Sequence, residues 1–117
     1  MARKPFVGGN WKMNLHTTEA VDLPLQCQEV AAVGAAIKGS GIKLGAQDVY
    51  HEGNGAFTGE VSTSMLKDVG VEVVLTGHSE RRHVIGESDV LINAKTRAAL
   101  KAGFEVILCI GEKIEQR

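Results

Sequence analysis

The chain has few cysteines, almost no net charge and no long apolar segment. Its two cysteines, Cys27 and Cys109, lack CxxC spacing and companion histidines, so we expect buried thiols and neither a disulfide framework nor a zinc site. A formal net charge of −1 gives no electrostatic reason to expect nucleic acid or an anionic membrane as a partner. No apolar stretch approaches the roughly 18 residues that a membrane helix needs, and no signal-peptide core follows Arg3 and Lys4. We therefore expect a cytoplasmic protein.

The composition is that of a folded domain. Hydrophobic residues make up 44% of the 117 residues and charged residues 23%, which is typical of a soluble globular chain and not of a disordered one. The length suits one domain of ordinary size, so we expect residues 1–117 to form a single domain.

One short pattern, a glycine, an apolar residue, a charge and an apolar run, occurs at 41–46, 70–75 and 103–108. The starting glycines lie 29 and 33 residues apart, which suits repeated units of strand, loop and helix. Because the apolar runs do not alternate with polar residues, the strands are expected to be covered on both faces, as in a parallel sheet. Together with an apolar run near the N-terminus, the predicted strands are 5–11, 42–47, 71–76 and 104–110.

Helices are predicted between these strands. Ser88 is the expected N-cap of the clearest one, which ends near Gly103. Leu91, Ala94 and Ala98 lie on one face of that helix. The other predicted helices are 25–38, 63–68 and a short one at 18–23 before Pro24. No strand pattern occurs between 11 and 41, so a right-handed connection of helices is expected to bridge that interval.

Polar residues follow each predicted strand. Because the carboxyl ends of parallel strands share one edge of the sheet, these residues are expected to meet around a common hollow. They are Asn10 and Lys12, Gln47 and Asp48, His78 and Glu80, and Glu112 and Lys113.

Lys12 and His78 carry the most useful chemistry in this set. The ammonium group of Lys12 lies beside two amide side chains in the sequence and could neutralise a phosphate or a developing oxyanion. The alternative is an exposed lysine at a strand end. His78 could act as an acid, a base or a hydrogen-bond donor to a carbonyl. The alternative for His78 is a cap on the following helix.

The neighbours of His78 are expected to have structural roles. Ser79 is not flanked as Gly-x-Ser-x-Gly, so helix capping is favoured over nucleophilic attack. Arg81 and Arg82 are expected to form ion pairs within the protein, because two adjacent arginines in a neutral chain do not indicate nucleic-acid binding. The remaining histidines have no supporting cluster and are expected at the surface; they are His16, His51 and His83.

Residues 53–60 form a glycine-rich loop with an apolar tip. Phe57 lies near the centre of this segment, which suits insertion into a pocket of a partner subunit. A simple mobile loop is the alternative.

Four segments in order, 8–14, 45–60, 77–82 and 109–112, closely resemble triosephosphate isomerase, and the similarity spans nearly the whole chain. The resemblance implies a (β/α)₈ barrel that interconverts dihydroxyacetone phosphate and glyceraldehyde 3-phosphate, an isomerase of glycolysis and gluconeogenesis. It implies no cofactor and no metal. It also implies a phosphorylated triose as substrate and a homodimer as the assembly.

The same resemblance implies a role for each matching residue. Asn10 and Lys12 match residues that contact the substrate, and Lys12 would supply positive charge for the anionic substrate and intermediate. His78 matches the neutral electrophile that hydrogen-bonds the carbonyl and moves protons between oxygens. Glu80 matches a carboxylate near the lysine. Residues 53–60 match the dimer loop that carries Phe57, and Thr58 would reach the partner's active site.

The chain departs from the family in two ways. A complete barrel needs roughly 250 residues, whereas this sequence stops at Arg117, so the glutamate general base, the lid and the phosphate-binding loops are expected to be missing. Compared with the family, a strand and part of the first helix are also expected to be deleted between Asp22 and Gln28. We therefore expect an incomplete barrel of about four parallel strands, inactive alone and not a stable monomer because its edges and apolar face are uncovered.

Two other interpretations stay open. The chain could be a half-barrel module that binds sugar phosphates or assembles with a partner, or a fragment without a function of its own.

Overall fold

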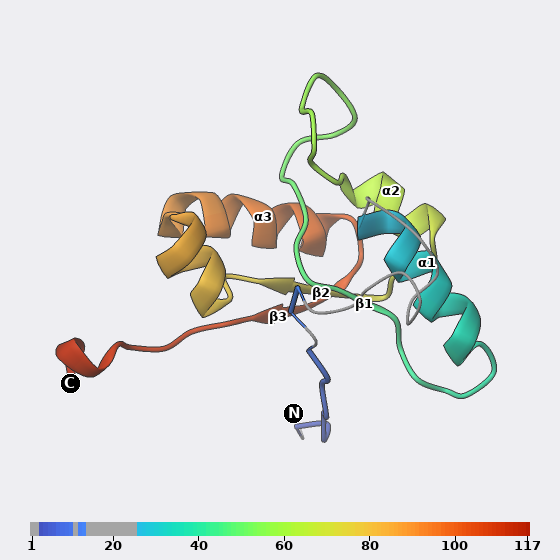
Figure 1. The fold of residues 1–117 in the computed structure, drawn as a ribbon, viewed down its shortest axis with the longest axis horizontal. Helices are drawn as coiled ribbons and strands as arrows, with labels where there is room; N and C mark the ends of the chain where they lie inside the picture. Colours follow the sequence, from blue (N-terminus) through green and yellow to red (C-terminus); the bar gives the residue numbers. More distant parts are fainter. Residues whose placement is uncertain (1–2, 11, 14–25) are drawn as a thin grey trace.

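The computed structural model describes residues 3–10, 12–13 and 26–117, which form a small parallel sheet with helices packed on it (Figure 1). Along the chain the elements are α1 (Gln26–Ile37), β1 (Gly45–Ala46), α2 (Thr63–Asp68), β2 (Val73–Thr76), the π-helix η1 (Arg81–Ile85), α3 (Asp89–Lys101), β3 (Glu105–Leu108) and the 3₁₀ turn η2 (Ile114–Gln116).

The sheet has the order β1-β2-β3, and both pairs of neighbours are parallel. Gly45 lies opposite Val73, which lies opposite Glu105. The ladder continues one residue past β3, where the Cys109 N–H donates to the Thr76 carbonyl at 2.8 Å. The predicted parallel α/β architecture is therefore confirmed.

The predicted number of strands is wrong for the described residues, which contain three and not four. Residues 3–10 are irregular, and residue 11, the end of the first predicted strand, lies outside the described residues. A strand needs a neighbour to receive its hydrogen bonds, and no backbone hydrogen bond joins the described residues 3–10 to the sheet. The strand predicted at 42–47 pairs only at Gly45 and Ala46.

The predicted helices agree well with the structure. In α3 the Ser88 hydroxyl accepts a hydrogen bond from the Leu91 N–H at 3.2 Å, as expected of an N-cap. Gly103, two residues beyond α3, has φ +88°, the left-handed conformation that commonly ends helices. Both α2 and the described part of α1 also match their predictions. The predicted helix at 18–23 and Pro24 lie outside the described residues.

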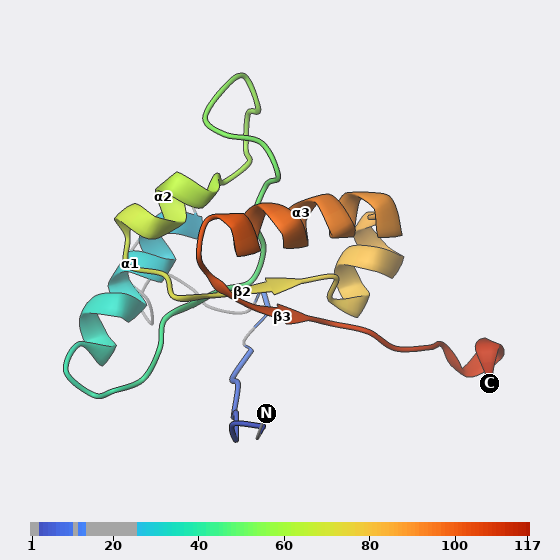
Figure 2. The same ribbon diagram turned by 180° about the vertical axis from the view of Figure 1, so that it is seen from behind.

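The buried face of α3 differs from the prediction by one position. Leu91, Ala94 and Ala98 are only half-buried, whereas the adjacent line of Ile92, Lys95 and Ala99 is fully buried. α3 packs over β2 and β3, and α2 lies on the same side of the sheet (Figures 1 and 2). The core between these layers consists of Val30, Leu44, Ala46, Val49, Leu66, Val71, Val74, Ala99 and Phe104.

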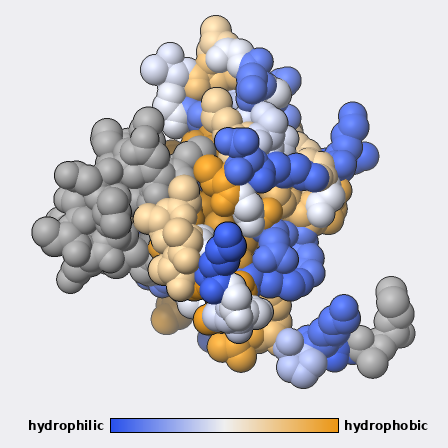
Figure 3. Space-filling model, turned by 90° about the vertical axis from the view of Figure 1, so that its right-hand side faces the viewer, coloured by the Kyte–Doolittle hydropathy of each residue, from blue (hydrophilic) through white to orange (hydrophobic). Residues whose placement is uncertain are grey.

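The other side of the sheet is less covered. Residues 3–10 lie on this side and extend away from the sheet towards the N-terminus, and the segment after β3 extends away from the body to η2 (Figures 1 and 2). Several apolar side chains are exposed, among them Val7 at 98%, Ile110 at 84% and Ile114 at 84%. Viewed from the α1 end, apolar surface lies among hydrophilic side chains (Figure 3). No helix in the described part of the chain is long and apolar enough to cross a membrane.

Candidate functional site

The site begins where β2 ends. After Thr76 the chain turns at Gly77, whose φ of +69° is the left-handed conformation that favours glycine. A Cβ atom at Gly77 would lie 2.8 Å from Nη2 of Arg82 and 3.1 Å from the carbonyl oxygen of Cys109, so there is also no room for a side chain. This turn directs His78 out of the sheet, and a short helix starts at Ser79.

The ring of His78 is fixed by the backbone that follows it. The Glu80 N–H donates to Nδ1 of His78 at 3.4 Å. Nδ1 also lies 3.5 Å from Oε2 of Glu80, but the backbone N–H can only donate, so Nδ1 acts as the acceptor. With Nδ1 as the acceptor of this bond, Nε2 is the ring nitrogen left to donate. His78 caps the helix, as in the alternative interpretation, and its Nε2 has no hydrogen-bond partner among the described residues.

Lys12 is brought next to this ring through Glu80. Its Nζ lies 2.7 Å from Oε1 of Glu80, and the hydrogen bond from Lys12 is the main reason why the pKa of Glu80 is lowered. Among the described residues, Lys12 is the one non-glycine residue with positive φ, at +58°. Its N–H donates to Oδ1 of Asn10 at 2.8 Å, which holds this uncommon conformation.

Asn10 and His78 line one hollow on the less covered side of the sheet, together with Gln47 and Cys109. Its volume is about 790 Å³, which is enough for a small ligand. The walls come from residues 6–9 and from the apolar side chains of the sheet that face away from α3, including Val73, Leu75 and Ile107. Of the residues predicted to meet there, Asn10, Gln47 and His78 line the hollow. Lys12 and Glu80 do not line it and are joined to it only through the contact of Glu80 with His78.

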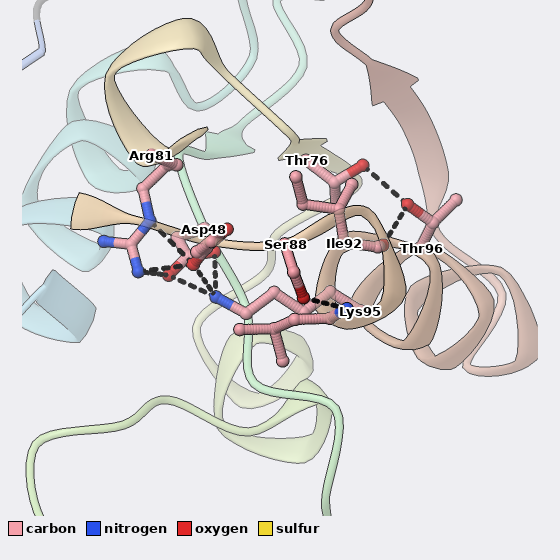
Figure 4. A network of polar contacts seen from close by, with 9 residues as sticks. Asp48, Thr76, Arg81, Ser88, Ile92, Lys95 and Thr96 are labelled. Atoms are coloured by element: carbon pink, nitrogen blue, oxygen red, sulfur yellow. Dashed lines mark hydrogen bonds and ion pairs between the residues drawn. The ribbon is translucent and has the colours of Figure 1, made fainter. Parts of the chain in front are cut away.

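Asp48, which was expected at the same hollow, lies in a buried ionic cluster on the other side (Figure 4). Nζ of Lys95 lies 2.9 Å from Oδ1 of Asp48 and also binds Oε1 of Glu87. Nη2 of Arg81 lies 2.6 Å from Oε1 of Glu87 and 3.2 Å from Oδ2 of Asp48. This ionic cluster of Asp48, Arg81, Glu87 and Lys95 ties α3 to the loop after β1 and to η1.

The ionic cluster sets the charge state of Glu87. Burial alone would raise the pKa of this carboxyl, but hydrogen bonds from Lys95 and Arg81 outweigh burial and lower it. Sequence reasoning expected ion pairs for Arg81 but missed Lys95 and Glu87. The signal for Lys95 was its position between Ile92 and Ala99 on one helical face.

Two other residues expected at the hollow lie elsewhere. The Glu112 carboxylate accepts a hydrogen bond from Nε of Arg117 at 3.0 Å, and the Lys113 N–H donates to Oε1 of Gln116 at 2.7 Å. These local contacts hold both residues in the segment that runs away from the sheet after β3 (Figure 1). The edge prediction is wrong for Glu112 and Lys113 because the chain does not turn back there.

The remaining predictions near the site have mixed outcomes. No hydrogen bond from the Ser79 hydroxyl occurs within the described part of the chain, so His78 and not Ser79 caps the helix. His83 is exposed, as expected, but His51 is partly buried against Tyr50, with ring centroids 4.5 Å apart. Cys109 is half-buried, and burial raises the pKa of its thiol.

The loop at 53–60 projects from the body of the molecule (Figure 1). Phe57 is 39% exposed and packs on Tyr50, with ring centroids 4.8 Å apart, and Thr58 is exposed. Oδ1 of Asn54 accepts hydrogen bonds from the hydroxyls of Ser62 and Ser64, which fixes the base of the loop. Within the described residues, no group of three or more His, Cys, Asp and Glu side chains could hold a metal ion.

Comparison with known proteins gives a consistent result. The family model described as triosephosphate isomerase matches residues 5–117. The triosephosphate isomerase of Alkaliphilus oremlandii is 42% identical over 132 residues, covering 98% of this chain and 53% of that protein. That of Taenia solium is 45% identical over 133 residues, covering 100% of this chain and 53% of that protein. The chain thus spans about half the length of the curated relatives it matches.

The structure comparison agrees. The crystal structure of triosephosphate isomerase from Bartonella henselae superposes with a TM-score of 0.72 and 38% identity, covering 77% of this chain and 38% of that one. The stretch of 132 residues matched in the Alkaliphilus protein is longer than this whole chain of 117, so that relative has residues without a counterpart here. Extra residues of this kind in the relative are what an internal deletion in this chain would produce.

Proposed function

Because the chain belongs to the triosephosphate isomerase family, we propose that its hollow binds a phosphorylated triose and supplies the carbonyl-polarising half of the isomerase site. The reaction is the interconversion of dihydroxyacetone phosphate and glyceraldehyde 3-phosphate, a step of glycolysis and gluconeogenesis. The observation that carries this proposal is the group at the end of β2, where His78 lines a hollow shared with Asn10 and lies beside the Lys12–Glu80 pair.

His78 is the electrophile in this proposal. Its Nε2–H donates to the substrate carbonyl and continues to hold that oxygen as it becomes an enediolate oxygen, the point at which a fixed donor contributes most. The ring can then pass the proton between the two adjacent oxygens of the intermediate. The bond from the Glu80 N–H keeps Nδ1 an acceptor and so keeps the proton on Nε2.

Lys12 supplies the positive charge. An anionic phosphate and a developing enediolate both gain from an ammonium group held nearby. The carboxylate of Glu80 positions that group, and Asn10 holds the Lys12 backbone through its side chain. Asn10 and Lys12 are therefore the proposed substrate-binding residues, and His78, Lys12 and Glu80 the proposed catalytic group.

The described lining of the hollow contains no aspartate or glutamate that could remove a carbon-bound proton. Glu80 is engaged by Lys12, which keeps its charge on that pair. We therefore propose that a polypeptide of these 117 residues alone isomerises triose phosphates poorly, since loss of a general base costs about 10² to 10⁴ in rate.

The direct test is turnover of dihydroxyacetone phosphate by the purified 117-residue polypeptide, with a full-length relative measured in parallel. We expect a kcat/KM at least about a hundredfold lower than that of the relative. A comparable value would refute the proposed lack of a base.

Binding without turnover is the second candidate, favoured by the preformed Lys12–Glu80 pair beside His78. It is tested by calorimetry with phosphoglycolate, which carries a phosphate and a carboxylate in place of the enediolate. We expect heat of binding from the unmodified polypeptide, loss of that heat in Lys12→Ala, and little change in Lys101→Ala, an exposed lysine at the end of α3. A folded sample that gives no heat excludes binding.

The proposed assembly is a homodimer in the cytoplasm. The loop at 53–60 projects from the body (Figure 1), and in this proposal it inserts Phe57 and Thr58 into a pocket of the partner. On η1, Val84 is 77% exposed and Ile85 is 62% exposed, and such apolar side chains favour a covering partner. The cytoplasm follows from the proposed place of the reaction in glycolysis.

A further inference from the structure

Arg82 holds both peptide groups that flank His78. Its backbone N–H donates to the His78 carbonyl at 3.1 Å, and its side-chain Nε donates to the Gly77 carbonyl at 2.7 Å. The peptide planes on either side of the His78 Cα are thus held by one residue. Because these planes set the direction of the Cα–Cβ bond, Arg82 constrains where the imidazole points.

The same guanidinium is anchored to two further elements. Its Nη2 donates to the Cys109 carbonyl just beyond β3 at 3.2 Å, and its Nη1 pairs with Asp89 in the first turn of α3. The side chain of Arg82 is 22% exposed, so these contacts are made in a largely dry environment. The turn that carries His78 is thereby joined to β3 and to α3.

The shape of an arginine is required for this arrangement. Guanidinium is planar and presents several N–H groups in a fixed fork, so it can donate to two carbonyls and a carboxylate together. A lysine ammonium is a point charge on a flexible stem and cannot reach the same three acceptors in one geometry. The absence of a side chain at Gly77 completes the fit, since a Cβ there would lie 2.8 Å from Nη2.

We propose that Arg82 is a positioning residue that sets the orientation and the tautomer of His78. With the turn fixed, the Glu80 N–H meets Nδ1, and the proton stays on Nε2 of a ring that lines the hollow. When the side-chain contacts of Arg82 are lost, the turn at Gly77 relaxes and the bond between Glu80 and His78 weakens. This inference rests on the proposed function only in that His78 is taken as the electrophile.

The test uses the ¹⁵N resonances of the His78 ring in the 117-residue polypeptide. In the unmodified chain we expect two well-separated shifts, one for an acceptor Nδ1 and one for a protonated Nε2. In Arg82→Lys we expect the two shifts to converge, because the ring then samples both tautomers. Arg81→Lys is the matched control: it weakens the bonds to Glu87 and Asp48, so we expect lower stability and unchanged His78 shifts.

A folded Arg82→Lys variant with the shifts of the unmodified chain would overturn the proposal, as would an equal change in Arg81→Lys. If Arg82→Lys does not fold, Asp89→Asn decides, since the Asp89 side chain is 90% exposed and its replacement weakens only one anchor. In Asp89→Asn we expect the two shifts to converge less than in Arg82→Lys. Unchanged shifts in Asp89→Asn would overturn the proposal. If phosphoglycolate gives no heat, the proposed binding function is refuted but the proposal for Arg82 is not. The ring shifts report the tautomer of His78 without any ligand.

Discussion

Lys95 illustrates how a single side chain can organise this part of the fold. It is 2% exposed, and its ammonium lies between the carboxylates of Asp48 and Glu87. A buried ion pair adds little over a well-packed apolar pair, but removing one partner leaves the others charged and without compensation. In this cluster a lost ammonium would leave two carboxylates and only Arg81 to balance them.

Lys95→Met is therefore expected to destabilise the chain by about 3–5 kcal/mol. The measurement is the urea midpoint followed by circular dichroism. Lys101→Met, at an exposed lysine of the same helix, is the control and is expected to change stability by less than about 0.5 kcal/mol. Equal midpoints for the two variants would contradict the importance of the ionic cluster.

Glu87 gives the fold a dependence on pH. Since its pKa is lowered in the folded chain, folding gains stability at pH values above the ordinary carboxyl pKa of 4.5. That stability is expected to be lost as pH falls below 4.5 and through the lowered pKa. Urea midpoints measured from neutral to acid pH would reveal the loss.

The matched variants for this pH experiment are Glu87→Gln and Glu105→Gln. Glu87→Gln is expected to flatten the acid limb because the variant has no carboxyl to protonate there. Glu105 pairs with Lys43 at the surface, where solvent screens the pair, so its replacement should leave the acid limb nearly unchanged. A steep acid limb in Glu87→Gln would assign the effect to other groups.

At the level of elements, α3 depends on its first turn. The Ser88 hydroxyl accepts the Leu91 N–H, one of the N–H groups that the helix itself cannot satisfy. Ser88→Ala is expected to cost about 1 kcal/mol, measured by urea unfolding. Ser79→Ala is the comparison, since Ser79 is exposed and the described residues provide its hydroxyl with no partner; a loss below about 0.5 kcal/mol is expected. Equal losses would mean that capping is not the cause.

The helices could be predicted because their signals are local. Ser88 and the glycines beyond α2 and α3 act through contacts within a few residues, so their effect can be read from the sequence. Whether residues 5–11 form a strand could not be predicted in the same way. A strand forms only where a neighbouring strand provides hydrogen bonds, and nothing in residues 5–11 specifies that neighbour.

The candidate site was partly predictable for the same reason. The end of β2 places His78 and Glu80 at the edge of the sheet as expected. Asn10 lines the same hollow as His78 although residues 3–10 are not part of the sheet. That edge does not determine which polar side chains turn into the core, so the burial of Asp48 with Lys95 was missed. For Arg82 the sequence predicts only an ion pair. Its bonds to the Gly77 and Cys109 carbonyls could not be predicted, because every residue has a backbone carbonyl.

At the level of the whole molecule, exposed apolar side chains remain. Ile85 on η1 is 62% exposed and Ile114 near the C-terminus is 84% exposed. If η1 forms part of the proposed dimer interface, Ile85→Lys is expected to convert a dimer into a monomer in sedimentation velocity, because a buried lysine without a partner is costly. Ile114→Lys is the control and should sediment as the unmodified chain does. A monomer in the unmodified chain, or equal effects of both variants, would reject this interface.

The burial of Lys95 also has a chemical consequence. An amine-acylating reagent can reach the exposed lysines of the folded chain at once, whereas the Lys95 amine is covered and held by two carboxylates. Its modification must therefore wait until α3 separates from the loop that carries Asp48. Mass spectrometry of the Lys95 peptide over time would then measure how often this unit opens under native conditions, without denaturant.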